Sequence, residues 1–261
     1  MVNKRALNLK KKLLNGGISP GIWVTLPCPA SCEIIADVGF DWVMVDAEHD
    51  PFNPETLLHM AMAFKGSDTV LLIRIPEKTE SFVKQVLDMG WDGVVFPQTN
   101  TLADARRVVS LCKYPPLGNR GYGPSRAGNY GKDENEYVEL ANDSVICVIQ
   151  IENISGAEQI EEIVQVPGID WIMVGPNDMS HSAGRFRDRK NPVLVDALNK
   201  IRNAAKAAGI PFSIGGGDTS DMNKIMDMGC PLVFLGKDAD YLQAAANNAL
   251  EMFRKTLKTK S

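Results

Sequence analysis

Eight short, continuous apolar runs, spaced along nearly the whole chain, constrain the fold more than any other feature of this sequence. Each run is rich in Val and Ile and carries little charge, as expected of parallel strands that are buried on both faces. We expect strands at Gly21–Leu26, Trp42–Asp46, Val70–Ile75, Gly93–Pro97, Val145–Glu152, Trp171–Gly175, Pro211–Ile214 and Leu232–Gly236.

Amphipathic segments lie between these runs, and several have readable helix starts. Asn53 with Pro54 precedes a helix at Leu57–Phe64, and Thr101 with Asp104 opens one at Leu102–Cys112. Ser155 with Glu158 predicts a capping box for a helix at Ala157–Val164.

Eight strand–helix units in 261 residues predict an α/β protein, specifically a (β/α)8 TIM barrel formed by a single domain over 1–261. An N-terminal helix precedes the first strand, and a long connection, Tyr114–Asp143, precedes the fifth. A doubly wound open sheet is the main rival, but no GxGxxG motif follows the first strand.

Composition excludes several classes of function. The net charge of -4 argues against a nucleic-acid-binding surface. No apolar run is long enough to predict a membrane span, and the N-terminus carries no apolar signal core, so we expect a cytoplasmic protein that binds neither nucleic acid nor membrane. The five cysteines lack CxxC spacing and are expected to be reduced and mostly buried.

Polar and ionisable residues gather where the expected strands end. In a barrel, the carboxyl ends of the strands converge on one site. The residues at these ends are Trp23 on the first strand, Asp46, Glu48 and His49 after the second, Arg74 on the third, Gln150 and Glu152 on the fifth, and Asn177 and Asp178 after the sixth.

Glu152 and Asp178 end neighbouring strands, so their carboxylates should repel unless a cation or a proton lies between them. Oxygen ligands without nearby cysteine favour Mg²⁺ or Mn²⁺ over zinc, with Co²⁺ as a further candidate. A shared proton or a salt bridge to Arg74 is the alternative. Arg74 is suited to stabilise an oxyanion. His49 is the candidate base, since His59 lies in a helix pattern and His181 in a loop.

The motifs together resemble one family. They are Gly39-Phe40-Asp41-Trp42 through Asp46-Ala47-Glu48-His49, Arg74 two residues before Pro76, Arg120-Gly121-Tyr122-Gly123, Gln150-Ile151-Glu152, and Gly175-Pro176-Asn177-Asp178-Met179-Ser180. Over about residues 5 to 255 the chain is similar to the HpcH/HpaI (citrate lyase-like) family of class II, metal-dependent pyruvate aldolases. That family includes 4-hydroxy-2-oxoheptanedioate aldolases and 2-keto-3-deoxy sugar acid aldolases.

The resemblance implies reversible cleavage of a 4-hydroxy-2-oxo acid to pyruvate and an aldehyde. The implied roles are metal ligation by Glu152 and Asp178, retention of metal-bound waters by Asp46 and Glu48, base catalysis by His49 paired with Asp88, enolate stabilisation by Arg74, and pyruvyl binding by Gln150, Asn177 and Asp178. It also implies a homo-oligomer, a trimer or hexamer, with the C-terminal helix at about 240–256 exchanged between subunits. Oxaloacetate decarboxylation, another lyase reaction at the same site, or a non-catalytic binding barrel are the alternatives.

The sequence departs from the family pattern where the aldehyde half of a substrate would lie. Asn177 replaces a common alanine, and Gly215-Gly216-Gly217 stands where a bulkier aliphatic wall is often found. The segment Pro176–Asn191 carries Arg185, Arg187 and Arg189, which either meet an anionic substrate or form a solvated loop.

Overall fold

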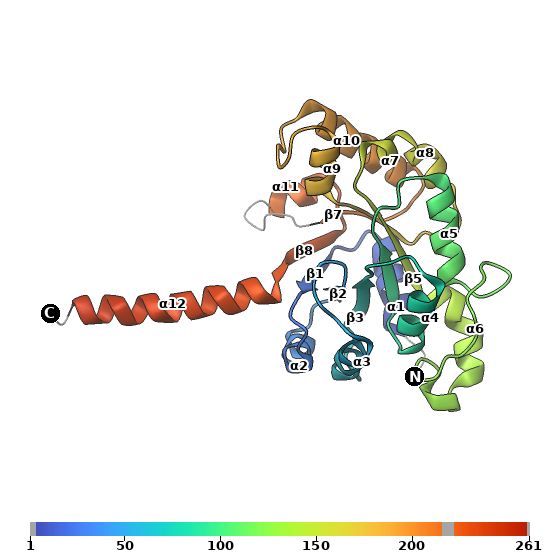
Figure 1. Ribbon diagram of the computed structural model, residues 1–261, viewed down its shortest axis with the longest axis horizontal. Helices are drawn as coiled ribbons and strands as arrows, with labels where there is room; N and C mark the ends of the chain where they lie inside the picture. The colour runs from blue at the N-terminus through green and yellow to red at the C-terminus, as the bar shows by residue number, and fades with distance from the viewer. Residues whose placement is uncertain (1–3, 216–221, 260–261) are drawn as a thin grey trace.

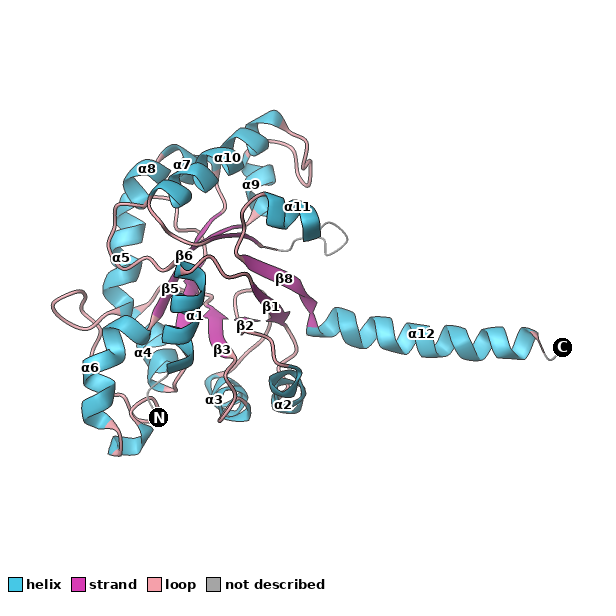
Figure 2. Ribbon diagram, turned by 180° about the vertical axis from the view of Figure 1, so that it is seen from behind, coloured by secondary structure: helices cyan, strands magenta, loops and turns pink. Residues whose placement is uncertain are grey.

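The chain folds into one eight-stranded parallel sheet that curls into a nearly closed barrel, seen in the computed structural model, which describes residues 4–215 and 222–259 (Figures 1 and 2). The strand order is β7-β6-β5-β4-β3-β2-β1-β8. β7 and β8 adjoin each other, but among the described residues no ladder of backbone hydrogen bonds joins them. The predicted α/β barrel with an N-terminal helix is confirmed.

The strands are β1 (Ser19–Val24), β2 (Trp42–Asp46), β3 (Val70–Arg74), β4 (Gly93–Phe96), β5 (Ile146–Ile151), β6 (Trp171–Val174), β7 (Phe212–Ile214) and β8 (Leu232–Lys237). The helices are α1 (Lys4–Leu14), α2 (Pro29–Val38), α3 (Pro54–Ala63), α4 (Glu80–Asp88), α5 (Leu102–Cys112), η1 (Asn129–Gly131), α6 (Glu134–Ser144), α7 (Ile154–Glu158), α8 (Ile160–Ile163), α9 (Pro176–Ser182), α10 (Pro192–Ala207), α11 (Met222–Asp227) and α12 (Asp238–Lys258). All eight predicted strands are present, and their ends differ from the prediction by only a few residues.

Two of the three predicted helix starts are correct. The Asn53 side chain caps α3, and Thr101 forms a reciprocal capping box with Asp104 at α5. The box predicted at Ser155 is wrong, because the Asn153 side chain caps the helix two residues earlier and accepts from the Ser155 backbone N–H. The segment is also divided at Gln159 into α7 and α8.

The barrel interior is filled by aromatic side chains. Trp42 packs edge-on against Trp171 and Phe234, with ring centroids 5.0 and 4.7 Å apart. Ala6 and Leu9 of α1 belong to the same cluster, so this helix covers the amino-terminal end of the barrel. This end is therefore closed by packing, which leaves the carboxyl end of the strands as the open mouth.

The long connection between α5 and β5, which contains η1 and α6, lies at the closed end of the barrel. Arg120 within it is buried, and its Nη2 donates to Asp88 Oδ1 at 2.6 Å. Its guanidinium also lies over the Tyr114 ring, 4.6 Å from the centroid. The connection thus anchors the end of α4 and lies away from the mouth.

Helix α12 projects away from the barrel (Figures 1 and 2). Asp238 at its start is buried and accepts from the backbone N–H groups of Thr25, Leu26 and Ala239 and from the Thr25 hydroxyl. From Tyr241 to Thr259 every residue is exposed, including Leu242, Leu250, Met252, Phe253 and Leu257. Of the described helices, none has the length and apolar character needed to span a bilayer.

Gly21 offers a direct test of the aromatic packing in the barrel. A Cβ at this position would lie 2.1 Å from Cδ2 of the buried Trp42. We expect Gly21→Ala to lower the free energy of unfolding by at least about 2–3 kcal/mol, since neither strand nor ring can move away. Urea unfolding at one fixed protein concentration measures this change.

Gly123→Ala is the matched control, because its Cβ would meet nothing closer than Asp88 Oδ2 at 3.7 Å, an ordinary contact. Equal stability of the Gly21→Ala protein and this control would contradict the described packing.

Candidate active site

Arg74, at the end of β3, is the centre of the charged cluster at the barrel mouth. Its Nε and Nη2 donate to the two carboxylate oxygens of Asp46 at 2.9 and 2.5 Å, forming a bidentate pair. Nε also lies 3.2 Å from Glu48 Oε2. The guanidinium stacks over the Trp23 ring at 4.6 Å, so β1, β2 and β3 together fix its position.

Gln150 and Glu152, which alternate on β5 and at its end, extend this cluster across the mouth. Gln150 Oε1 accepts from Arg74 Nη1 at 3.4 Å, while Gln150 Nε2 donates to Glu152 Oε2. Glu152 Oε1 accepts from the Gln98 backbone N–H at 2.7 Å. A continuous chain of polar contacts therefore runs from Asp46 through Arg74 to Glu152.

Glu152 is buried, and its surroundings disfavour its charge. Its pKa is raised to about 7, chiefly by burial and also by the nearby charges of Glu48 and Asp178, while the Gln98 N–H and Arg74 act to lower it. Asp178 lies in the first turn of α9 and is exposed. Strand pairing, with Ile151 opposite Val174, places Glu152 and Asp178 just beyond the ends of neighbouring strands.

Glu48 is the second carboxylate whose charged form is disfavoured. Burial raises its pKa, although Arg74 and His49 act to lower it. Its Oε2 is buried and, within the part of the chain that the structure describes, accepts no hydrogen bond. The mouth thus gathers the carboxylates of Asp46, Glu48, Glu152 and Asp178 around the guanidinium of Arg74.

His49 lies at the edge of this cluster. Its side chain is 64% exposed, and Nε2 is 3.7 Å from Glu48 Oε2. The structure does not bring His49 and Asp88 together in one chain, because α4 ends at the closed end of the barrel, where Asp88 pairs with Arg120. His59 on α3 and His181 on α9 are both exposed and lie outside the polar chain around Arg74.

The donor set fits a hard divalent cation. The described residues contain no preformed group of three or more His, Cys, Asp or Glu ligands. Mg²⁺ and Mn²⁺, however, are commonly held by one or two carboxylates, with water and substrate oxygens completing the coordination. Two features would be relieved by a cation: the charge of buried Glu152, which burial and Asp178 disfavour, and the Glu48 Oε2 atom, which accepts no hydrogen bond within the described residues.

Comparison with known proteins identifies the family. Residues 20–245 match the HpcH/HpaI aldolase/citrate lyase family model. The chain belongs to this family, and it is an aldolase/lyase family enzyme. The chain is 35% identical to the 2-keto-3-deoxy-L-rhamnonate aldolase of Klebsiella pneumoniae, covering 94% of this chain and 92% of the relative. It is 31% identical to the 5-keto-4-deoxy-D-glucarate aldolase of the same organism, over 90% of this chain and 92% of that protein.

Solved structures agree with this assignment. A family protein from Burkholderia cenocepacia superimposes with a TM-score of 0.89 at 29% identity, over 95% of this chain and 99% of the other. The citrate lyase beta subunit of M. tuberculosis, solved with oxaloacetate and magnesium, shares the fold with a TM-score of 0.53 at 16% identity, over 85% of this chain and 92% of the other.

Sequence reasoning missed two residues that shape the site of this family member. Gln98, whose backbone N–H binds Glu152, has a left-handed conformation with φ of 52°. Lys78 Nζ donates to the Gln98 carbonyl at 2.8 Å and holds this turn. No residue pattern signals a left-handed glutamine.

Gly175 is the first residue of a motif in the sequence, but its physical role is evident only in the structure. A Cβ there would lie 2.7 Å from Glu152 Oε2 and 2.9 Å from Gln150 Nε2. The missing side chain leaves the space in which these two groups meet. Of the glycine run, Gly216 and Gly217 lie outside the described residues.

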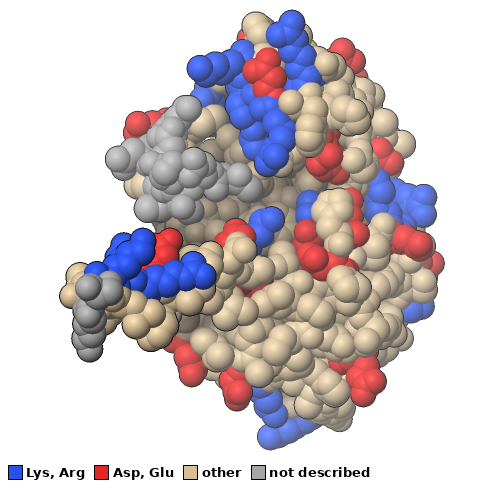
Figure 3. All heavy atoms as spheres, turned by 60° about the vertical axis from the view of Figure 1, so that its left-hand side comes forward, with Lys and Arg blue, Asp and Glu red and all other residues tan. Residues whose placement is uncertain are grey.

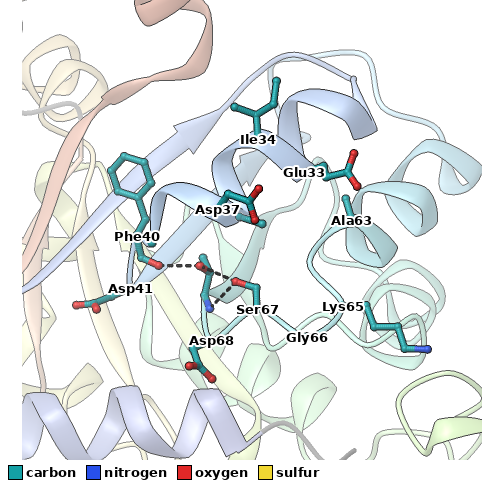
Figure 4. Close-up of a pocket in the computed structure, with 13 residues that line it drawn as sticks. Glu33, Ile34, Asp37, Phe40, Asp41, Ala63, Lys65, Gly66, Ser67 and Asp68 are labelled. Atoms are coloured by element: carbon teal, nitrogen blue, oxygen red, sulfur yellow. Dashed lines mark hydrogen bonds between the residues drawn. The ribbon is translucent and has the colours of Figure 1, made fainter.

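A separate cavity of about 890 Å³ lies between α2 and α3, lined by residues that include Asp37, Asp41, Lys65 and Asp68 (Figure 4). Thr69 crosses it by donating its hydroxyl to the Phe40 carbonyl at 2.8 Å. The lining residues belong to α2, to the end of α3 and to the turns that lead into β2 and β3, so the cavity opens at the closed end of the barrel. It is not part of the site at the mouth.

The charge balance around Arg74 can be tested by a double-mutant cycle. Arg74→Met should lower the free energy of unfolding by about 3 kcal/mol, because it leaves the buried Asp46 carboxylate uncompensated. Adding Asp46→Asn should recover at least about 1 kcal/mol. Urea unfolding in a chelator at fixed protein concentration measures both.

Lys4→Met is the control, since the Lys4–Glu136 pair at 3.1 Å is exposed and should matter little. An Arg74→Met protein as stable as this control would mean that Arg74 does not balance the cluster.

Proposed function

We propose that the enzyme is a class II aldolase that reversibly cleaves a 4-hydroxy-2-oxo acid into pyruvate and an aldehyde with the help of Mg²⁺ or Mn²⁺. The observation that carries this proposal is the crowding of Asp46, Glu48, Glu152 and Asp178 around Arg74 at the barrel mouth. Such a cluster favours a cation and an anionic substrate and disfavours a purely structural role.

Glu152 and Asp178 would hold the metal, which supplies Lewis-acid chemistry to a 2-oxo acid when bound. Asp46 and Glu48 would orient water around it. The hydrogen bonds that Glu152 accepts from Gln98 and Gln150 fix the direction in which its carboxylate points. The same carboxylates would exclude a second anion from this side of the mouth and so set the orientation of the substrate.

Arg74 faces the position at which negative charge develops. Its Nε and Nη2 are occupied by Asp46, whereas Nη1 reaches only a long 3.4 Å contact with Gln150. This nitrogen is therefore the one best placed to donate to the oxygen of a pyruvate enolate. Gln150 and Asn177 would bind the pyruvyl carboxylate, and Trp23 would limit the space beside it.

His49 is the proposed acceptor of the proton that the substrate loses during cleavage. In the cleavage direction it would accept the proton of the 4-hydroxyl, directly or through one water, as the C3–C4 bond breaks. The bonding electrons pass to C3 and form the pyruvate enolate, and the 4-hydroxyl carbon becomes the aldehyde. Protonation of C3 then releases pyruvate. Exposure of His49 is consistent with a group that must exchange this proton with solvent.

We further propose a homo-oligomer, a trimer or hexamer, in which α12 is exchanged between subunits and the single barrel domain is completed by a neighbour. The solvent-exposed apolar side chains of α12 support this proposal. If His49 pairs with Asp88, the pairing must join different subunits, because the two residues lie at opposite ends of one barrel. Burial raises the pKa of Asp88 although Arg120 acts to lower it, so a second hydrogen-bond donor would favour its charged form.

Metal dependence is the primary test of the proposed reaction. We expect pyruvate release from a panel of 4-hydroxy-2-oxo acids to stop on chelation and to return with Mn²⁺ or Mg²⁺. Glu152→Ala should abolish this return, because one of two protein ligands is missing. Coupled pyruvate detection measures the rate, and oxaloacetate in the same panel separates cleavage from decarboxylation. Full activity of Glu152→Ala without added metal would refute the mechanism.

Subunit complementation tests the His49–Asp88 pairing. His49→Asn and Asp88→Asn should each lose activity, the former by about 10²–10⁴-fold. Co-expressed in equal amounts, they should regain about a quarter of wild-type activity, since half of the chains supply each intact residue to a shared site. A His49→Asn and Arg74→Met mixture is the control and should regain nothing, because these residues belong to one mouth. If the His49→Asn and Asp88→Asn chains form mixed oligomers but regain no activity, pairing of His49 with Asp88 between subunits is excluded.

A further inference from the structure

Lys78, in the loop between β3 and α4, is a cationic residue that the proposed reaction does not use. Figure 3 shows Lys and Arg side chains gathered over the α9–α10 end of the molecule, above a hollow in the surface. That group includes Arg189, whose Nη2 donates to Asn177 Oδ1 at 2.9 Å. Lys78 instead follows β3, which is separated from β6 and α9 by β4 and β5. It therefore lies on a different side of the barrel mouth.

The backbone around Lys78 is held by two helices. The Lys78 carbonyl accepts from Arg107 Nη2 of α5 at 3.2 Å. The next residue, Thr79, caps α4 by accepting from the Phe82 N–H at 3.4 Å. The Lys78 side chain thus starts from a fixed backbone and extends to the segment that follows β4, where its Nζ meets the Gln98 carbonyl.

Gln98 links Lys78 to the proposed metal site through its two backbone groups. Its N–H donates to Glu152 Oε1 at 2.7 Å, and its carbonyl accepts from Lys78 Nζ at 2.8 Å. The Gln98 side chain is exposed. The contribution of Gln98 to the site is therefore the direction of its backbone N–H.

The peptide unit between Gln98 and Thr99 is held from both sides. The Gln98 carbonyl and the Thr99 N–H belong to one trans peptide unit, so they point in opposite directions. The Thr99 N–H donates to the Gln150 carbonyl on β5 at 3.1 Å. Lys78 holds the other side of the same plane, and the plane is fixed only when both contacts are made.

The conformation of Gln98 explains why the contact from Lys78 is needed. Its φ of 52° lies in the left-handed region, which glutamine rarely adopts. A residue in this region stays there only when its surroundings hold it. A return to negative φ would change the angle between the Gln98 N–H and its carbonyl, so the hydrogen bonds to Glu152 and Lys78 would not both survive.

The charge of Lys78 also acts on the mouth directly. The pKa of Lys78 is lowered chiefly by burial, whereas the charges of Asp104, Glu152 and Glu48 act to raise it. The ammonium is therefore close enough to interact with two carboxylates of the site. A positive charge here repels a metal ion held by Glu152. The direct effect of this charge and its effect through Gln98 thus act on metal binding in opposite directions.

We propose that Lys78 is a positioning residue for the metal ligand Glu152. Its ammonium holds Gln98 in the left-handed conformation, the Gln98 N–H then fixes the Glu152 carboxylate, and the affinity for Mg²⁺ or Mn²⁺ depends on this order. The inference rests on the proposed function, which makes Glu152 a ligand. It assigns Lys78 a role in metal retention, although Lys78 touches neither metal nor substrate.

Mn²⁺ binding to the metal-free protein tests this role, because electron paramagnetic resonance measures free Mn²⁺ without any turnover. Lys78→Met removes the ammonium and should raise the Kd for Mn²⁺ about tenfold, the lower end of the range for groups that orient a ligand. Lys78→Arg keeps a charged donor and should restore most of the affinity. An unchanged or lower Kd in Lys78→Met would overturn the inference, since loss of the charge alone predicts tighter binding.

Glycine at position 98 tests the route through the backbone. Glycine adopts the left-handed conformation without strain, so it should make Lys78 less necessary. In a Gln98→Gly background, Lys78→Met should raise the Kd by no more than about twofold. Gln98→Ala is the matched control, because alanine also removes the side chain but disfavours the left-handed conformation, and the full effect of Lys78→Met should remain. Equal effects in the two backgrounds would mean that Lys78 does not act through Gln98.

Hydrogen exchange gives a second readout that needs no metal. The segment that contains Gln98 should exchange faster in metal-free Lys78→Met, as measured by mass spectrometry, because its N–H is released from Glu152. The other segments should exchange as in the wild-type protein, which also verifies the fold of the variant. Unchanged exchange around Gln98 would contradict the proposed role.

Two further proteins keep this inference apart from the proposed function. Lys65→Met removes an exposed lysine before β3 at the closed end of the barrel and should leave the Kd unchanged. If the wild-type protein binds no Mn²⁺, or Glu152→Ala binds it equally well, the proposed function fails. If Mn²⁺ binding requires Glu152 but Lys78→Met and Lys65→Met behave alike, only the inference about Lys78 fails.

Discussion

The mouth of this barrel depends on one buried positive charge. Arg74 is wedged between Asp46 and Glu48, stacked on Trp23 and linked through Gln150 to Glu152. Without it, the carboxylates at the ends of β2 and β5 would face each other in a poorly hydrated space. Even with it, the pKa values of Glu48 and Glu152 remain raised. The single positive charge of Arg74 therefore does not balance the negative charge of the carboxylates, and the site favours a cation.

Most of this arrangement could be predicted from the sequence, because barrel topology converts strand ends into neighbours. Trp42–Asp46 and Val70–Ile75 are recognisable as buried strands, so Asp46 and Arg74 had to emerge at one edge. Their pairing, with Asp46 opposite Arg74 in the ladder, follows from register alone. The residues that meet at the barrel mouth could therefore be predicted once the number and order of the strands were recognised.

What could not be predicted depends on local geometry that several sequences can satisfy. The left-handed Gln98, the space left by Gly175 and the bond from Arg189 to Asn177 all arise from tertiary contacts with no periodic signature. The cap on α7 was assigned to Ser155 when Asn153, two residues earlier, competes for the same role and wins. Likewise, the family resemblance implied a partner for Asp88, but it gave no sign that Arg120 would pair with Asp88 within the chain.

Asp238 has a mechanical consequence. Four donors converge on its carboxylate at the point where α12 leaves the barrel, and no residue from Tyr241 to Thr259 is buried. A helix of this length extends about 30 Å from that anchor. Since the arm is long, a rotation of about 10° at the anchor would displace its tip by roughly 5 Å, about one helical turn. The Asp238 carboxylate thus sets the direction of α12. A small change in the orientation of the helix at residue 238 becomes a large displacement at its far end.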